Sequence, residues 1–114
     1  MYNLFTKEEV GDFIVTALEG GSNYWIDSIT ISRKGCPEGT EYYNVPTAGG
    51  HIGVVEFDGD GTVHILDPIT LDRGFHTLLK KYPWHYKALI KEEYDVETAD
   101  ALLQCALFGD IVYG

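Results

Sequence analysis

The segment Glu19-Gly20-Gly21-Ser22-Asn23-Tyr24-Trp25 connects a helical pattern to a strand pattern, and it constrains the fold of this chain most strongly. Two glycines, two small polar residues and two large aromatic residues follow one another within it. Because helices commonly end at a left-handed residue that glycine adopts without steric penalty, Gly20 and Gly21 predict the end of the helix. Trp25 then begins the buried face of a strand, so the segment predicts a corner between helix and sheet.

The helix before this corner is expected over residues 7–19. Thr6-Lys7-Glu8-Glu9 is a capping box, in which the side chains of Thr6 and Glu9 each accept a hydrogen bond from the backbone of the other. Apolar residues then recur at intervals of three and four, as one face of a helix requires: Val10, Phe13, Ile14, Ala17 and Leu18.

Residues 24–32 alternate in a way that predicts a strand with one apolar face. Asp27 falls on that face with Trp25, so it is expected either at the margin of the sheet or beside a partner. Residues 33–50 contain repeated Gly and Pro and predict a long loop, a feature that is often functional or mobile. Within this loop, Tyr42-Tyr43 is expected to form a short edge strand.

A β-hairpin is expected from two strand-like segments, residues 52–57 and 62–66. Asp58-Gly59-Asp60-Gly61 between them has the composition of a tight turn. A calcium-binding loop starting at Asp58 would need glycine sixth and an acid twelfth, but Val63 and Ile69 occupy those positions. The segment therefore predicts an ordinary turn.

Two helices are expected after the hairpin. An apolar stripe over residues 71–82 predicts a helix that is capped by Thr70 and ended by Pro83. Residues 84–90 are expected as a short helix or turn.

The last helix is expected to begin after Asp95, to end at Gly109 and to be the most buried, because it carries apolar residues on several faces. A final short strand is expected at residues 111–113. The order of elements predicts one α+β domain over residues 1–114, in which a small, mostly antiparallel sheet is packed on one face by a single layer of about three helices.

Acidic residues outnumber basic ones by 18 to 8, and the formal net charge is −10. Because nucleic-acid binding depends on Lys and Arg releasing counterions from phosphates, direct binding of DNA or RNA is not expected. Five of the 8 basic residues lie within residues 73–91, however. A local basic surface that binds a small anionic ligand is therefore kept as an alternative. No apolar run approaches the ~18 residues that span a bilayer, and residues 1–7 lack a signal-peptide pattern, so a cytoplasmic, non-membrane protein is expected.

The spacing of the cysteine and histidine residues does not indicate a metal site or a cofactor. Cys36 and Cys105 are expected as reduced thiols, with Cys105 buried in the last helix. The 4 histidines lack the spacing of a compact metal site. His85 lies between Trp84 and Tyr86, and the sequence fits either a packing role or a binding role for its imidazole. The sequence has no nucleophile elbow, P-loop or dinucleotide fingerprint.

Three stretches together resemble an uncharacterised family of small bacteriophage and mobile-element proteins. They are the segment 18–25, the segment Lys81-Tyr82-Pro83-Trp84-His85, and residues 95–100 with residues 104–114. Residues 33–67 lie outside the resemblance. That family has no settled activity, so the resemblance implies only a context, an accessory protein in the cytoplasm of a bacterial host.

We expect these three stretches to meet in space and any site to lie there. The candidate ligand- or partner-binding residues are Glu19, Ser22, Asn23, Tyr24, Trp25, Trp84, His85, Asp100 and Gln104. The leading hypothesis is a non-enzymatic protein that binds a host component and antagonises host defence, its acidic surface meeting a basic nucleic-acid-binding site.

Two alternatives remain beside this hypothesis. In the first, a pocket at the corner sequesters a small nucleotide-like ligand, with Tyr24, Trp25 or Trp84 stacking on the base. In the second, the chain is a small enzyme that uses His85 and a carboxylate. The oligomeric state is not predicted.

Overall fold

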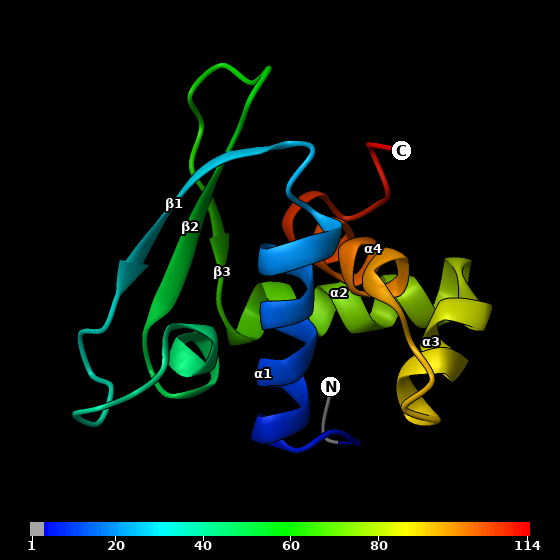
Figure 1. Ribbon diagram of the computed structural model, residues 1–114, viewed down its shortest axis with the longest axis horizontal. Coiled ribbons are helices and arrows are strands. Elements are labelled where there is room, and N and C mark those ends of the chain that lie inside the picture. The colour runs from blue at the N-terminus through cyan, green and yellow to red at the C-terminus, as the bar shows by residue number, and fades with distance from the viewer. Residues whose placement is uncertain (1–3) are drawn as a thin grey trace.

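The computed structural model describes residues 4–114. The chain runs through α1 (Lys7–Thr16), a π-helical turn η1 (Ala17–Gly21), β1 (Ile26–Ser32), a 3-10 helix η2 (Tyr42–Thr47), β2 (His51–Glu56), β3 (His64–Leu66), α2 (Pro68–Lys81), α3 (Pro83–Ile90) and α4 (Val96–Phe108). The strands lie together on one side of the molecule, with α1, α2 and α4 packed beside them and α3 at the far end (Figure 1). This arrangement is the predicted α+β fold.

The sheet is antiparallel throughout, with β2 between β1 and β3. The predicted hairpin is confirmed, since Ile52 pairs with Leu66 across β2 and β3, but β3 begins only at His64, so the connection over residues 57–63 is longer than the four-residue turn expected. Ile26 pairs with Glu56 and Ser28 with Val55, so Asp27 is the extra residue of a β-bulge. The side chain of Asp27 is exposed, because the bulge removes it from the apolar face that holds Trp25.

Two expected strands do not form. Tyr42-Tyr43 begins η2, which packs against α1 at Gly11, where a Cβ would lie 2.2 Å from Oδ1 of Asn44. Residues 111–113 belong to no strand. Both predictions were wrong because short β-rich segments become strands only where a partner strand lies beside them, and these two segments dock on helices instead.

Local signals at the helix ends mostly predict the structure. Thr6 and Glu9 form the predicted capping box, with the Glu9 amide donating to Thr6 Oγ1 at 3.0 Å. Asp95 caps α4 by accepting from the Thr98 amide at 3.1 Å, and Gly109 ends that helix in a left-handed conformation with φ 77°. These predictions are confirmed because capping depends on residues three or four positions apart.

The beginning of α2 differs from the prediction. Asp67, not Thr70, is the N-cap: its Oδ1 accepts from the Thr70 amide at 2.9 Å, and the Asp67 amide donates to Thr70 Oγ1 at 3.0 Å. Pro68 is the first helical residue, a position where its missing N–H costs nothing. Pro83 begins α3 in the same way, and Tyr82 separates the two helices.

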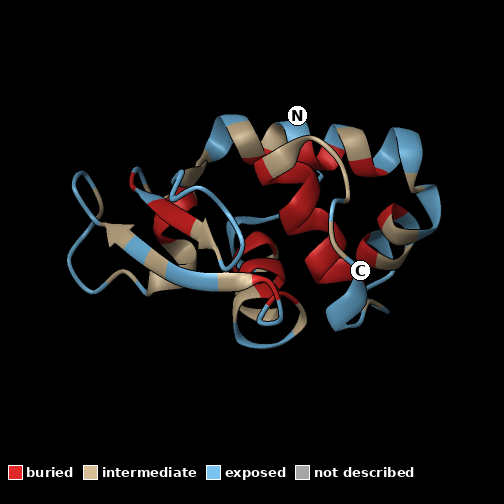
Figure 2. Cartoon of the chain, turned by 90° about the horizontal axis from the view of Figure 1, so that it is seen from above, coloured by how far each residue is buried: buried red, intermediate tan, exposed pale blue. Residues whose placement is uncertain are grey.

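The core is centred on α4, whose residues 98–107 are all buried. Figure 2 shows buried residues concentrated where the helices face one another and along β2. Phe13 and Phe75 fill the space beside α4, and Ile52 and Leu66 supply the buried face of the sheet. Cys105 lies in this core as a free thiol, and burial raises its pKa to about 12. No helix within residues 4–114 has the length and apolar character to cross a membrane.

Candidate functional site

The corner segment reaches α4 because of its glycines. A Cβ on Gly21 would lie 2.1 Å from the carbonyl oxygen of Val96, and one on Gly20 would lie 3.1 Å from Cγ1 of Val96. Neither glycine adopts the left-handed conformation that was expected to end the helix, and that prediction was wrong. The glycines instead allow two backbones to touch, which places residues 22–25 against α4.

Asp100 of α4 accepts hydrogen bonds from side chains of the corner segment and from Gln104. Oδ1 accepts from Ser22 Oγ at 2.7 Å and from Trp25 Nε1 at 2.8 Å. Oδ2 accepts from the Tyr24 hydroxyl at 2.8 Å and from Gln104 Nε2 at 3.0 Å. The residue is 7% exposed, and all four of these donors are neutral groups. Burying a carboxylate is costly without such hydrogen bonds, so this network allows a negative charge to remain inside the fold.

Gln104 extends the same network to the C-terminal residues. Its Oε1 accepts from the amides of Val112 and Tyr113, each at 2.8 Å, and its Nε2 lies 3.3 Å from the Tyr113 carbonyl oxygen. Nε2 also lies 3.3 Å from the Tyr24 hydroxyl. One fully buried amide therefore holds Val112 and Tyr113 against the corner.

The Tyr24 phenol is held in its protonated state. Burial of the hydroxyl, the hydrogen bond to Asp100 and the charge of Asp100 raise the pKa of Tyr24 to about 12, and the charge of Glu97 adds to the effect. The rest of the side chain is turned outward, because Tyr24 is 55% exposed. Tyr24 thus donates to Asp100 at neutral pH while its ring forms part of the surface.

These groups line a pocket of about 130 Å³. Glu97, Asp100 and Gln104 come from one face of α4, since residues three and four apart on a helix are neighbours. Tyr24 and His85 line the pocket from the corner and from α3. His85 Nδ1 lies 2.8 Å from Oγ1 of the buried Thr98, which fixes the imidazole beside α4. Parts of all three segments singled out in the sequence therefore meet here.

Five of the nine candidate residues do not line the pocket, and one of them, Ser22, is fully buried and donates to Asp100. Glu19 accepts from the Tyr42 hydroxyl of η2, and Asn23 is exposed. Trp84 is 61% exposed on α3, where its ring contacts His85 but does not line the pocket. Trp25 is 2% exposed and stacks on Tyr113 with ring centroids 5.3 Å apart, so it cannot stack on a ligand.

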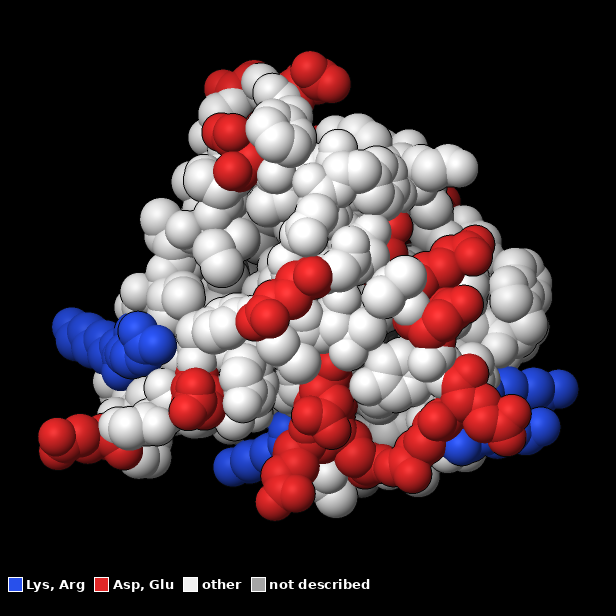
Figure 3. Space-filling model, in the orientation of Figure 1, with Lys and Arg blue, Asp and Glu red and all other residues white. Residues whose placement is uncertain are grey.

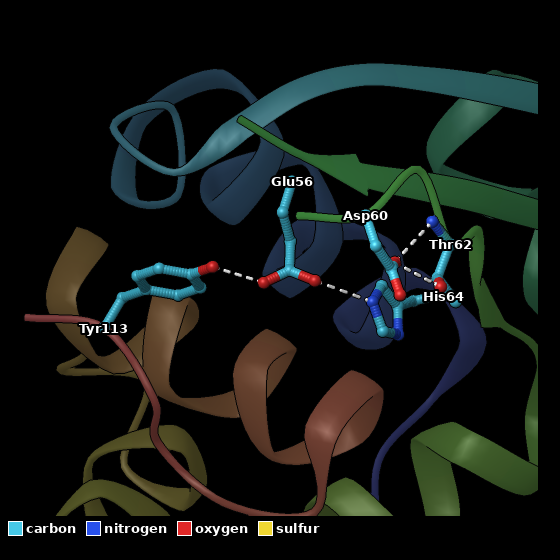
Figure 4. Close-up of polar contacts among 5 residues, drawn as sticks. All are labelled: Glu56, Asp60, Thr62, His64 and Tyr113. Carbon is cyan, nitrogen blue, oxygen red and sulfur yellow. Dashed lines mark hydrogen bonds and ion pairs between the residues drawn. The ribbon is translucent and has the colours of Figure 1, made fainter. Parts of the chain in front are cut away.

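No sequence pattern indicates a second polar cluster, in which Glu56 joins three parts of the chain. Glu56 of β2 accepts from the Tyr113 hydroxyl and lies 2.8 Å from His64 Nε2 of β3 (Figure 4). Tyr113 is 57 positions from Glu56 in the sequence, so no local spacing indicates their contact. The cluster fastens the end of the described chain to the hairpin and so fixes one wall of the pocket.

The hairpin turn is structural, as its sequence predicts. Asp60 Oδ1 accepts from the Thr62 amide at 3.0 Å, which closes a local turn (Figure 4). Within the part of the chain that the structure describes, no three His, Cys, Asp or Glu side chains are grouped so as to hold a metal ion.

Charge is unevenly distributed around the site. Figure 3 shows acidic side chains scattered over the visible face and basic ones near its margins. Two bases of the segment 73–91 bind within the fold: Arg73 Nε donates to the Ala106 carbonyl at 3.1 Å, and Lys81 pairs with Asp110 at 2.9 Å. The pocket itself carries the carboxylates of Glu97 and Asp100. Comparison with protein-family models, curated proteins and solved structures finds no match for this chain.

Proposed function

We propose that this chain acts by binding a protein partner, and that the pocket between the corner and α4 is the centre of its binding face. Asp100 carries this proposal: it is a buried carboxylate whose hydrogen-bond donors are all neutral. Its charge is thus stabilised by hydrogen bonds but is not neutralised by them. Such a site attracts a positive group from outside the molecule.

The proposed partner has a basic surface. The net charge of −10 gives the whole molecule a field that attracts cationic surfaces and speeds encounter with them. In keeping with the resemblance to phage accessory proteins, we propose a host component that itself binds nucleic acid, such as a defence factor. Occupation of its basic site by this acidic protein would antagonise that factor.

A nucleotide-like ligand is less well supported. The pocket of about 130 Å³ is smaller than the roughly 300–1,000 Å³ typical of cofactor and drug sites. Glu97 and Asp100 would also repel a phosphate group. Of the three aromatic residues expected to stack on a base, Trp25 is buried and Trp84 does not line the pocket.

An enzyme is also less well supported, although His85 and two carboxylates line the same pocket. A general base must accept a proton from the substrate within hydrogen-bond reach. Each oxygen of Asp100 already accepts two hydrogen bonds, which uses the acceptor capacity of that carboxylate. Binding a cation requires only the charge of Asp100, which the network preserves.

The proposal is tested by capture and titration. The tagged chain is used to capture proteins from a bacterial host lysate, and each captured protein is purified and titrated at several salt concentrations. We expect a basic partner whose affinity falls steeply with salt, because salt screens the attraction between solvent-exposed charges on the two surfaces. A complex that is insensitive to salt, or a partner without a basic surface, contradicts the proposal.

A further inference from the structure

We propose that the pocket between the corner and α4 binds a protonated primary alkylamine, of the kind that ends a lysine side chain. This inference rests on the proposed function, in which the partner presents a basic surface. It adds the chemical group that the pocket receives and the residue that recognises it.

The size of the pocket suits the end of a side chain. A cavity of about 150 Å³ holds a benzene molecule, so a pocket of about 130 Å³ has room for a group of a few heavy atoms. An ammonium group with its neighbouring methylenes is of this size. Ala101 and Ile111 add apolar surface to the lining, against which a methylene stem can pack while its charged end meets the carboxylates.

The two carboxylates of the pocket have different roles toward such a group. Asp100 supplies charge, because both of its oxygens are occupied by donors from the corner and from Gln104. Glu97 lies one turn earlier on the same face of α4 and is exposed, so its carboxylate is accessible to an incoming donor. We therefore assign Glu97 as the direct hydrogen-bond acceptor for the ammonium group.

An ammonium group fits this arrangement better than a guanidinium group. Guanidinium binds carboxylates best through two parallel hydrogen bonds, which need both oxygens of an unoccupied carboxylate in one plane. Ammonium is a compact point charge with three donors that can satisfy a single acceptor and still gain from the second charge. The aromatic rings of Tyr24 and Tyr113 in the lining are a further favourable surface for a cation.

The walls of the pocket are fixed before any ligand arrives. Tyr24 is held by Asp100, and the backbone at Tyr113 is held by Gln104. The Tyr113 hydroxyl binds Glu56, and His85 is held by Thr98. Such preorganisation reduces the entropy that must be lost on binding.

The test titrates the whole chain with four small probes. Binding is measured from shifts of the backbone amide resonances of residues 97–104 and of the side-chain amide of Gln104 in nuclear magnetic resonance spectra. The probes are Nα-acetyl-lysine methylamide, its arginine and norleucine counterparts, and pentylamine. We expect saturable shifts with the lysine probe, weaker ones with the arginine probe and none with the norleucine probe. Pentylamine separates two sources of the amine: equal binding indicates a free alkylamine, and weaker binding indicates a polypeptide.

A matched pair of variants tests the role of Glu97. Glu97→Gln removes the charge of the proposed acceptor, whereas Glu38→Gln removes the same charge from an exposed residue outside the pocket. We expect Glu97→Gln to weaken binding of the lysine probe by about threefold or more, and Glu38→Gln to leave it nearly unchanged. Equal shifts with the norleucine probe, no shifts with the lysine probe, or wild-type affinity in Glu97→Gln would each overturn the inference.

The same variants separate this inference from the proposed function. A salt-sensitive partner complex that Glu97→Gln leaves intact, with no binding of the lysine probe, rejects the ammonium pocket and leaves the proposed function standing. Binding of the lysine probe without any salt-sensitive partner complex supports the ammonium pocket and rejects the proposed function.

Discussion

The hydroxyl of Tyr24 lies 2.8 Å from Oδ2 of Asp100, although the two residues are 76 positions apart in the chain. Through this contact and those of Ser22 and Trp25 with the same carboxylate, the corner after α1 is fastened to α4. Asp100 therefore joins two parts of the fold and also gives the neighbouring pocket its charge. Its contributions to stability and to binding can be separated by substitution.

Asp100→Asn is expected to destabilise the protein by about 2–4 kcal/mol, because it turns an acceptor of four hydrogen bonds into a mixed donor and acceptor. In one orientation of the new amide its NH2 group faces another donor, Trp25 Nε1. In the other orientation it faces the donor Gln104 Nε2. Gln104 cannot reverse its amide without losing the hydrogen bonds from Val112 and Tyr113 to its Oε1. Urea unfolding followed by circular dichroism measures the loss.

Asp12→Asn is the control for this measurement. Asp12 undergoes the same chemical change on the exposed face of α1. We expect a change within about 0.5 kcal/mol there. A similar loss in both variants, or a loss below about 1 kcal/mol for Asp100→Asn, contradicts the role given to the buried network.

Elements that depend on short sequence separations were predictable. The capping box of α1, the helical stripes and the hairpin all involve residues within about four positions of one another or strands joined by a short connection. The strand expected at Tyr42-Tyr43 failed because its fate depends on Asn44 docking at Gly11 of α1. Single-sequence patterns carry no information on such distant contacts.

The glycines of the corner illustrate the same limit. Their position at the end of a helical pattern predicts a left-handed helix end, which is the common case. The structure uses the missing Cβ of Gly21 for contact with the Val96 carbonyl oxygen, 75 positions away in the sequence. The location of the corner was thus predictable, while the reason for its glycines was not.

Gly21→Ala is accordingly expected to destabilise the protein by about 2–3 kcal/mol, since its Cβ would lie 2.1 Å from a backbone oxygen that cannot move alone. Gly20→Ala is the matched control from the same turn. Its Cβ would lie 3.1 Å from Cγ1 of Val96, a side-chain atom that can shift, so we expect a loss below about 1 kcal/mol. Thermal unfolding of the two variants checks this order, and equal losses would show that contact with α4 does not explain the glycines.

The candidate site was predictable in part. Asp100 and Gln104 are four positions apart on a strongly patterned helix, so their common face follows from helical geometry. Glu97 lies three positions before Asp100 on the same face, which is a signal that sequence reasoning could have used. The contribution of Tyr113 is different, because it depends on hydrogen bonds to Gln104 and Glu56 that no local pattern indicates.

The two thiols are expected to react very differently with a thiol reagent. Burial raises the pKa of Cys105 to about 12 and leaves its side chain inaccessible, whereas Cys36 is partly exposed. Because the thiolate is the reactive form, native protein should be modified at Cys36 alone, and Cys105 should react only as the chain unfolds. Cys36→Ser isolates the buried thiol, and rapid modification of that variant under native conditions would contradict its placement in the core.

The ionisation of Tyr24 provides a test of its contact with Asp100 that does not require a measured free energy of unfolding. The pKa of Tyr24 is raised from 10.0 to about 12, because burial and the neighbouring carboxylate disfavour the phenolate. Folding therefore favours the protonated phenol, and the resulting stability is fully present below pH 10 and is lost as the pH rises from 10 to about 12.

The Cζ resonance of labelled tyrosine, assigned by its absence in Tyr24→Phe, should keep its protonated position through the lower part of that interval. The same residue in urea-unfolded chain is the internal control and should titrate at its ordinary value. A Tyr24 resonance that titrates equally in folded and unfolded protein would mean that the hydroxyl is solvated and does not bind Asp100.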